Sequence, residues 1–598
     1  MPEAATAFER CGRPTGSMKI FDARSRLRSR SRAVRPCGAV CWTLAITWAL
    51  FNTTAQGQDA ETPAAQDPAQ GLDSVEAAEA AALEAQLAQS GATIRAINVF
   101  VGNVFDPDNP KENKPLYRWA NKVHFATHDS VIESALLFRV GDRYERRVLD
   151  ETARALRGRN YIADVKIGPA GYDPVANTVA VDVHVRDAWT LAPELKYSHK
   201  GGASEWALGI DDHNLFGTGK QVRIIQKQLI DRDETLLSYG DPNLLGSRVR
   251  LEAEYTNASD GYRHVLAAER PFYALDTRWM LGGNVLSQQR VDPIYDLGQQ
   301  VDEFGHDIKG FSFQGGWSRG FVDGAVRRWL VGVTSSEDIF YPTIDTPNPL
   351  LLPENRKLVY PWVGWELLVD DHREMSELND IGRTEDVSFG TSLFVSLGLA
   401  DKSYGSDRNA TLLNTTFQKG WDLGGRGRML TMNAAGSTRD EADGLHNSII
   451  EAAAHYYVRN GENRLFAATT AFTATNNLDA ENQILLGGDN GLRGYPLRYQ
   501  AGESRALLSL EERFFTDFYP WRLFRVGYAA FLDVGRVSGA DPRTSPSLGT
   551  LYDVGLGLRL SSPRASGKSV VHIDLAFPLN GDPTIDTTQI IIETKGSF

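Results

Sequence analysis

From residue 189 to the C-terminus, the chain repeats short segments in which apolar and polar residues alternate, separated by turns and charged loops. Clear examples occupy 554–560, 571–577 and 590–595. In another, residues 524–535, apolar side chains share one face, and the other face carries Arg525, Gly527, Ala529, Phe531, Asp533 and Gly535. Successive side chains of a strand point to opposite faces, so each segment predicts a strand with one apolar face.

An apolar face opposed by a face of charges and glycine fits a membrane β-barrel with lipid outside and a wet lumen. A soluble β-sandwich is the alternative, since it also has one apolar face, which it turns inward. The 55 glycines, the aromatic content of 10% and the terminal Phe598 favour the barrel. At roughly 25 residues per strand and loop, residues 189–598 predict an antiparallel transmembrane barrel of about 16 strands.

Residues 93–188 have a different pattern, that of a small α+β domain. A strand is expected from Ile94, followed by one helix after Thr127-His128-Asp129 and another over about 145–156. Two more strands follow, from Tyr161 and from Thr178, with a turn at Asn177. The predicted element order is therefore β-α-α-β-β.

The first 57 residues read as a secretory signal peptide, because a basic run over 24–35 precedes a short apolar stretch over 39–51. The stretch is too short for a membrane helix, and Met18 is an alternative start. Residues 58–92, rich in Ala, Gln and Glu, are predicted to be a disordered or partly helical linker. All three cysteines, Cys11, Cys37 and Cys41, precede residue 58, so the exported chain would contain no disulfide.

Charge narrows the choice of partners. The whole chain carries a formal net charge of −13, and removal of the basic N-terminal segment would make the remainder more acidic. A strongly acidic chain argues against nucleic acid as a partner.

Two similar turns, at 214–217 and 243–246, each precede a predicted strand. They are expected at the end of the barrel nearer the N-terminal domain, with the polar segments 231–233, 257–261 and 370–384 at the opposite end. Residues 217–220, Gly-Thr-Gly-Lys, imitate a phosphate loop but lack its first glycine and its Ser or Thr. No other catalytic or metal-binding motif stands out, so the chain is predicted not to be an enzyme and to need no cofactor or metal.

The stretch from Gly487 to Pro496 combines several glycines with one long cation, Arg493. Two carboxylates follow on alternating segments, Glu511 and Asp533, both on the face opposite the large apolar residues. Neighbouring strands could therefore direct both acids at one guanidinium in the lumen. We expect Arg493 to lie at the tip of a loop folded into the barrel.

Two motifs, Leu492-Arg493-Gly494-Tyr495 and Phe531-Leu532-Asp533-Val534-Gly535, together resemble the paired signature of the BamA/TamA superfamily of outer-membrane barrels. The α+β domain resembles a POTRA domain of that family. The resemblance implies a lumen-loop site formed by Arg493, Gly494, Tyr495, Glu511, Asp533 and Gly535. It also implies a periplasmic N-terminal domain, insertion by the barrel assembly machinery with Phe598 as its signal, and contact with outer-membrane lipid.

The resemblance predicts a protein that inserts or translocates a polypeptide client, captured by strand addition to the POTRA-like domain near Ile162 or Val181. Only one such domain is visible, whereas assembly factors of the family usually carry several and secretion transporters two. A passive pore, or a barrel that handles lipid without a protein client, is the alternative. A structural surface antigen is a third.

Overall fold

A computed structural model describes residues 82–595, except 88, 426, 540, 566–569 and 584. The expected signal peptide, most of the linker and Phe598 lie outside these residues. Residues 82–87 and 89–90 are helical. No helix in the described part of the chain is both long enough and apolar enough to cross a membrane.

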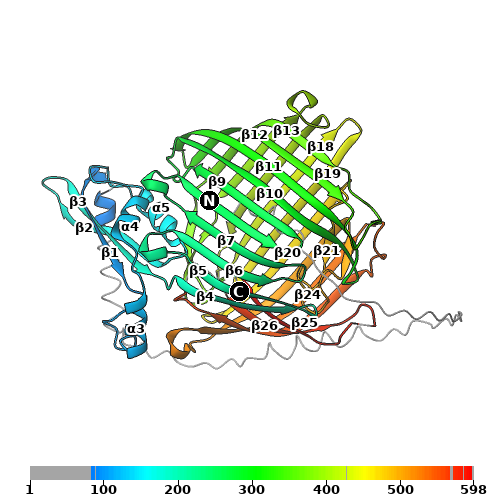
Figure 1. Cartoon of the computed structure of the whole chain (residues 1–598). Helices are drawn as coiled ribbons and strands as arrows, with labels where there is room; N and C mark the ends of the chain where they lie inside the picture. Colours follow the sequence, from blue (N-terminus) through cyan, green and yellow to red (C-terminus); the bar gives the residue numbers. More distant parts are fainter. Residues whose placement is uncertain are drawn as a thin grey trace, which may run out of the picture. The chain divides into compact units, whose positions relative to one another are not determined.

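A closed antiparallel barrel of 20 strands forms the main body of the structure (Figure 1). Its first ten strands are β4 (Leu191–Lys200), β5 (Ala203–Asp212), β6 (Gln221–Gln228), β7 (Asp233–Asp241), β8 (Arg250–Ala258), β9 (Gly261–Arg270), β10 (Trp279–Asp296), β11 (Gln299–Val322), β12 (Ala325–Tyr341) and β13 (Arg356–Val369). The others are β16 (Thr391–Ala400), β17 (Ala410–Asp422), β18 (Met429–Glu441), β19 (Gly444–Arg459), β20 (Arg464–Asn476), β23 (Ser504–Phe515), β24 (Arg525–Ser538), β25 (Thr550–Ser561), β26 (Val570–Pro578) and β27 (Gln589–Lys595).

The predicted barrel is confirmed, but the predicted number of about 16 strands is wrong. The error comes from the assumed length per strand and loop. The first six barrel strands have only 8 to 10 residues each, and the turns between them are short. This part of the chain therefore fits more strands than the estimate allowed.

The expected alternation of faces is present in the C-terminal strands. In β24, Tyr528 is exposed, whereas Phe531 and Asp533 are buried inside the barrel. In β25, Leu556 is exposed and Arg559 is fully buried. The outer wall is rich in exposed large apolar side chains, which include Trp206, Trp279, Phe311, Phe313, Trp317 and Trp329. A barrel with this surface is suited to lipid outside and a polar lumen.

The N-terminal α+β domain contains a three-stranded sheet of order β1-β3-β2, from β1 (Thr93–Gly102), β2 (Ile162–Asp173) and β3 (Thr178–Asp187). Its helices are α3 (Pro115–Val123), α4 (Asp129–Ala135) and α5 (Arg146–Arg157). The predicted elements are present, together with α3, which the sequence reading left as a polar insert. Pro115 begins this helix, where its missing N–H costs nothing.

The two residues expected to contact a client, Ile162 and Val181, are core residues of this domain. Their exposed fractions are 1% and 0%, and Val181 belongs to the central strand β3, which is paired on both sides. Large apolar strand residues fill the core first, so neither side chain is accessible, and contact of a client with this domain stays a prediction. The outer edge of β2 remains without a partner strand among the described residues.

The two similar turns lie at the end of the barrel that contacts the N-terminal domain, as expected. Asn214 donates from Nδ2 to Thr127 Oγ1 at 2.8 Å, and His128 N donates to Gly217 O at 2.9 Å. Gly217 has φ +75°, and a Cβ there would lie 2.2 Å from Ala126 O. The turn thus needs glycine both for its backbone and for its close approach to the domain.

The segment 370–384, expected at the opposite end, belongs instead to the end near the N-terminal domain. It includes most of a hairpin formed by β14 (His372–Ser376) and β15 (Thr384–Ser388). Arg154 and Arg157 of α5 bind this hairpin region through Asp370 at 2.9 Å and Asp386 at 2.7 Å. Its many acids suggested a solvated loop, but three of them, Asp370, Glu374 and Asp386, are partners of basic residues on α5.

The tip of this hairpin packs against side chains from the inner wall. Leu378 and Ile381 are buried in one apolar cluster, whose other members are Phe389, Met429, Tyr457, Leu465, Ala467, Phe515 and Ala529. Glu385 accepts hydrogen bonds from the backbone N–H groups of residues 378–380, which fixes the tip. The hairpin therefore occupies lumen space from the N-terminal-domain end.

The barrel closes between its last and first strands with little pairing. Among the described residues, the register of β27 and β4 contains the single pair Ile592 and His199, whereas β26 and β27 are paired from 570 to 576. We call the β27–β4 contact the seam.

Candidate functional site

The segment 477–503 connects β20 to β23 and folds into the lumen. Within it, β21 (Ile484–Leu486) and β22 (Gln500–Gly502) pair with each other. Its apolar side chains form a buried cluster with the barrel wall, made of Leu486, Leu492, Tyr495, Tyr499, Val537 and Leu551. Apolar burial on one side thus holds the segment against β24 and β25. We call it the lumen loop.

A second contact holds the lumen loop at the end of the barrel away from the N-terminal domain. Arg498 donates from both Nη atoms to the two carboxylate oxygens of Asp231, each at 2.9 Å. Tyr295 donates from its hydroxyl to Asp231 at 2.9 Å. All three side chains are buried, so this two-pronged ion pair also fixes the outer part of the loop.

Arg493 lies at the inner end of the lumen loop and forms a forked ion pair with the wall. Its Nε and Nη2 donate to Asp533 Oδ2 at 2.7 Å and Oδ1 at 2.9 Å. Nη1 reaches Glu511 Oε1 at 3.4 Å, and Nη2 donates to Ser509 Oγ at 3.2 Å. The guanidinium also stacks on Phe531, with 3.4 Å between Cζ and the ring centroid. Both hydrogen bonding and cation–π attraction therefore fix this side chain.

The acids that bind Arg493 are shared with two further arginines. Arg559 Nη2 donates to Glu511 Oε1 at 2.9 Å, and its Nη1 donates to Asp574. Arg513 Nη2 donates to Glu511 Oε2 at 3.2 Å. Asp574 also lies 3.6 Å from Arg493 Nη1. These residues alternate in charge, and each is at least nine-tenths buried. Buried charges are tolerated only when paired in this way.

Two glycines let the lumen loop approach the wall. A Cβ on Gly494 would lie 2.6 Å from the Cβ of Asp553, and one on Gly535 would lie 3.1 Å from the side chains of Leu486 and Leu492. Gly494 has no space for the Cβ of alanine, and at Gly535 the two leucine side chains would have to shift by a few tenths of an ångström. Gly494 and Gly535 therefore set the depth of the loop.

Tyr495 binds the far side of the loop to two wall segments. It is fully buried, and its hydroxyl lies 2.9 Å from Tyr552 O and 2.8 Å from Asn580 Oδ1. The backbone N–H of Tyr552 donates to the same hydroxyl at 3.1 Å. The phenol therefore joins the loop to β25 and to the turn after β26.

Arg513 connects these charges to the β14–β15 hairpin. Its Nη1 donates to Leu378 O, at the hairpin tip, at 2.7 Å. A chain of polar contacts therefore runs from α5 through the hairpin to Glu511 and Arg493. We call Arg493, Glu511, Arg513, Asp533, Arg559 and Asp574 the lumen cluster.

The structure thus brings together Arg493, Gly494, Tyr495, Glu511, Asp533 and Gly535, the residues that the sequence grouped. It leaves Ile162 and Val181 far from this site, in the core of the N-terminal domain. Sequence reasoning missed Arg513, Arg559 and Asp574 as members. Alternation within 504–515, 554–560 and 571–577 puts all three on the face opposite the large apolar residues, but the relative shift of neighbouring strands, which alternation does not specify, determines which charges meet.

One group among the described residues has the donor atoms for a metal ion: Glu441, Asp443 and His446. These residues surround the turn between β18 and β19, and Asp443 is exposed. The group is separate from the lumen cluster.

The C-terminal half of the barrel is similar to a known protein family. Residues 426–594 match the model of the Omp85 superfamily domain. The chain carries an Omp85 superfamily domain. All six residues of the lumen cluster lie inside the matched range. The match agrees with the superfamily that the Arg493 and Asp533 motifs indicated, and an Omp85 barrel implies the outer membrane of a Gram-negative bacterium.

The chain also has similar solved structures, all at low sequence identity. BamA from Haemophilus ducreyi lacking POTRA domains 1–3 is 12% identical, with a TM-score of 0.38, over 84% of this chain and 85% of that one. CdiB from Acinetobacter baumannii is 10% identical, with a TM-score of 0.40, over 85% and 74%. CdiB from Escherichia coli is 12% identical, with a TM-score of 0.36, over 90% and 99%. Comparison with curated protein sequences gives no significant match.

Proposed function

We propose that this Omp85 barrel inserts or translocates a polypeptide client across or into the outer membrane. The N-terminal domain would receive the client in the periplasm, and the lumen loop with Arg493 would guide it. The observation that carries the proposal is the buried, forked pairing of Arg493 with Asp533 inside a matched Omp85 domain. The protein would act by binding and conformational change, without chemical catalysis.

The contents of the lumen favour this proposal over a passive pore. The lumen loop enters from one end and the β14–β15 hairpin from the other, and buried side chains hold both. A passive pore needs a continuous water-filled path. Here two segments must move before a wide path can open, which suits a barrel controlled by its client.

The seam supports a role in handling extended chains. Within residues 191–595, the last strand has one registered pair with the first, so its backbone offers N–H and C=O groups that another strand could use. Outward apolar residues such as Ile590 would face lipid beside it. A client strand could pair there through backbone hydrogen bonds, independent of its exact sequence.

The N-terminal domain has two edge strands, β1 and β2. The start of β1 exchanges backbone hydrogen bonds with residues 141 and 142, so we place the client at β2. Since Ile162 and Val181 are buried, the accessible position is the outer edge of β2, where Lys166 is exposed. Strand addition at this edge would again use backbone groups for affinity.

The test combines a reversible seam closure with crosslinking in cells. Cysteines replacing His199 and Ile592 would sit on paired positions of neighbouring strands, at a spacing that suits a disulfide. A photo-crosslinking residue replaces Lys166. We expect polypeptide adducts that fall when the seam is oxidised and return on reduction.

The matched control places cysteines at Ser198 and Glu205, which pair within the β4–β5 hairpin and do not bridge the seam. This disulfide should leave the adducts unchanged. If adducts at position 166 are absent, or consist of lipid, while the protein conducts ions steadily with the seam oxidised, the passive or lipid-handling barrel is correct instead.

A further inference from the structure

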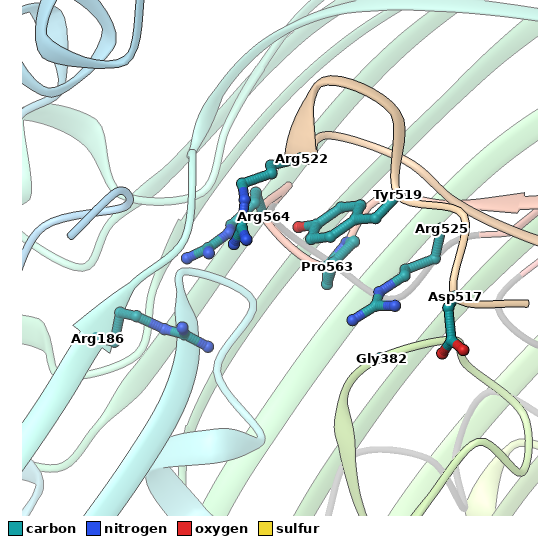
Figure 2. A pocket seen from close by; sticks show the side chains of 8 residues that line it. All are labelled: Arg186, Gly382, Asp517, Tyr519, Arg522, Arg525, Pro563 and Arg564. Carbon is teal, nitrogen blue, oxygen red and sulfur yellow. The ribbon is translucent and has the colours of Figure 1, made fainter. Parts of the chain in front are cut away.

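A cavity of about 350 Å³ lies where the N-terminal domain meets the barrel (Figure 2). Arg186 of β3 forms one side and Gly382 of the β14–β15 hairpin another. The remaining walls come from two barrel turns, and the residues involved are Asp517, Tyr519, Arg522, Arg525, Pro563 and Arg564. The cavity is thus assembled from four separate segments.

Four guanidinium groups line this cavity, and two of them already have a carboxylate partner. Glu112, buried beside the cavity, accepts from Arg522 at 3.3 Å and also pairs with Arg564. Asp517 is the only acid in the cavity wall. Counting Glu112 as well, the group keeps an excess of two positive charges.

Arg186 and Arg525 carry this excess. Among the described residues, no carboxylate lies within ion-pair distance of either side chain. The Nε of Arg525 is buried without a hydrogen-bond partner, although its guanidinium lies 4.4 Å from the centroid of the Tyr519 ring. A buried unpaired donor of this kind costs free energy.

The electrostatics of Arg186 agree with this shortage of anions. Burial, together with the charge of Arg564, lowers the pKa of Arg186 below its ordinary value, and the more distant Asp164 and Glu112 compensate only in part. An anion in the cavity would reverse this penalty, because it would face several cations at once.

We propose that this cavity binds a phosphate group. Planar guanidinium forks match phosphate oxygens, and the excess of two positive charges suits a phosphate mono- or dianion. The volume exceeds that of a bare phosphate and leaves room for an attached headgroup.

The surroundings point to a phosphate carried by a lipid. The turn 516–524 supplies cavity residues and also presents three exposed aromatic side chains, Phe518, Trp521 and Phe524. Aromatic residues of this kind concentrate at the membrane–water interface. The same turn would therefore lie at headgroup level while its polar side chains face the cavity. Free phosphate has the same chemistry, and the experiment separates the two sources.

The test uses the full-length protein in detergent. Native mass spectrometry with phosphatidic acid, and with diacylglycerol of the same acyl chains, measures whether the phosphate group is recognised. Titration with inorganic phosphate, followed by ³¹P NMR, measures binding without a lipid. We expect phosphatidic acid to bind and diacylglycerol not to bind.

The cavity variant is the double substitution Arg186→Gln with Arg525→Gln, which removes the two uncompensated charges. It should weaken phosphatidic acid binding at least about tenfold, since two charge-assisted hydrogen-bond donors are lost. Arg464→Gln is the matched control, because Arg464 is an exposed arginine at the same end of the barrel, paired with Glu512 outside the cavity. Heat-modifiable electrophoretic mobility checks that each barrel is folded.

Binding of both inorganic phosphate and phosphatidic acid, weakened in the double variant alone, supports the site, and binding of phosphatidic acid alone identifies a lipid as its source. Equal binding by the wild type and the folded double variant overturns the proposal. Binding of a peptide carboxylate at Arg186, with no binding of phosphatidic acid or inorganic phosphate, also overturns the proposal, because the cavity would then be a polypeptide site. The proposal does not depend on the proposed function, because it needs no client.

Discussion

At the residue scale, Arg493 joins the lumen loop to the wall by contacts that no other side chain can reproduce. Its fork binds both oxygens of Asp533, while its face stacks on Phe531. Lysine has neither the fork nor the planar face. Geometry, as well as charge, is therefore required at this position.

We predict that Arg493→Ala weakens docking of the lumen loop by about 3–5 kcal/mol, because it leaves buried carboxylates without a partner. Arg493→Lys should recover only a small part of this loss. Protease sensitivity of the segment 477–503 in the folded barrel measures the effect. Arg464→Ala, which breaks an exposed pair, should change the sensitivity little, since such pairs contribute about 0–1 kcal/mol.

Exchanging the charges of Arg493 and Asp533 tests whether the neighbouring acids contribute to the binding of Arg493. In Arg493→Asp with Asp533→Arg, the new carboxylate would face Glu511 and Asp574, which already lie near position 493. We therefore expect no recovery of protease resistance. Full recovery would mean that Arg493 and Asp533 act as an isolated pair, contrary to the shared cluster.

Only part of this site can be predicted from the sequence. Alternation places Glu511 and Asp533 on the inward face, and the glycines around Arg493 indicate close packing. Alternation also places Arg513 on this face, but its bond to Leu378 joins it to a segment more than a hundred residues earlier in the chain. Such contacts depend on the three-dimensional path of an irregular segment, for which local pattern carries no signal.

At the element scale, the β14–β15 hairpin is the main difference from the sequence-based expectation. Its short strands and acidic residues resemble an exposed loop, and it is contact with α5 that accounts for Asp370 and Asp386. Its apolar tip residues, Leu378 and Ile381, are nearly fully buried. The hairpin thus has a polar stem that binds the N-terminal domain and an apolar tip that binds the inner wall.

We predict that removal of residues 377–383 raises the ion conductance of the barrel in planar bilayers, because the tip no longer occupies the lumen. The matched control removes residues 344–350, an equal length from the loop between β12 and β13, where Ile344 is 99% exposed. That deletion should leave the conductance unchanged. Equal conductance in both deletions would mean that the lumen loop alone closes the barrel.

At the scale of the whole molecule, ion pairs connect the N-terminal domain to the barrel. Arg154 binds Asp370 through both carboxylate oxygens, at 3.0 and 2.9 Å. Burial tends to raise the pKa of Asp370, but the hydrogen bond from His372 and the charge of Arg154 outweigh it and lower the pKa below 3.8. The carboxylate therefore stays ionised well into the acid range.

The lowered pKa of Asp370 determines how docking of the N-terminal domain to the barrel depends on pH. A depressed folded-state pKa contributes stability that is complete above the unfolded value and is lost as the pH falls through the folded value. Docking should therefore be unchanged from pH 8 to about pH 5, as measured by hydrogen exchange in α5. Asp370→Asn should speed exchange there throughout this pH range. Loss of protection in the wild type near pH 6 would contradict this role of Asp370.

The number of strands, 20, determines how much inserted chain is needed to fill the lumen of the barrel. The width of a barrel grows roughly in proportion to its number of strands, so each added hairpin enlarges the central void. One inserted segment that fills a narrow cylinder leaves a gap in a broader one. Here a second insertion, the β14–β15 hairpin, enters from the opposite mouth and fills that gap. A barrel with more strands therefore needs more inserted chain to fill its lumen.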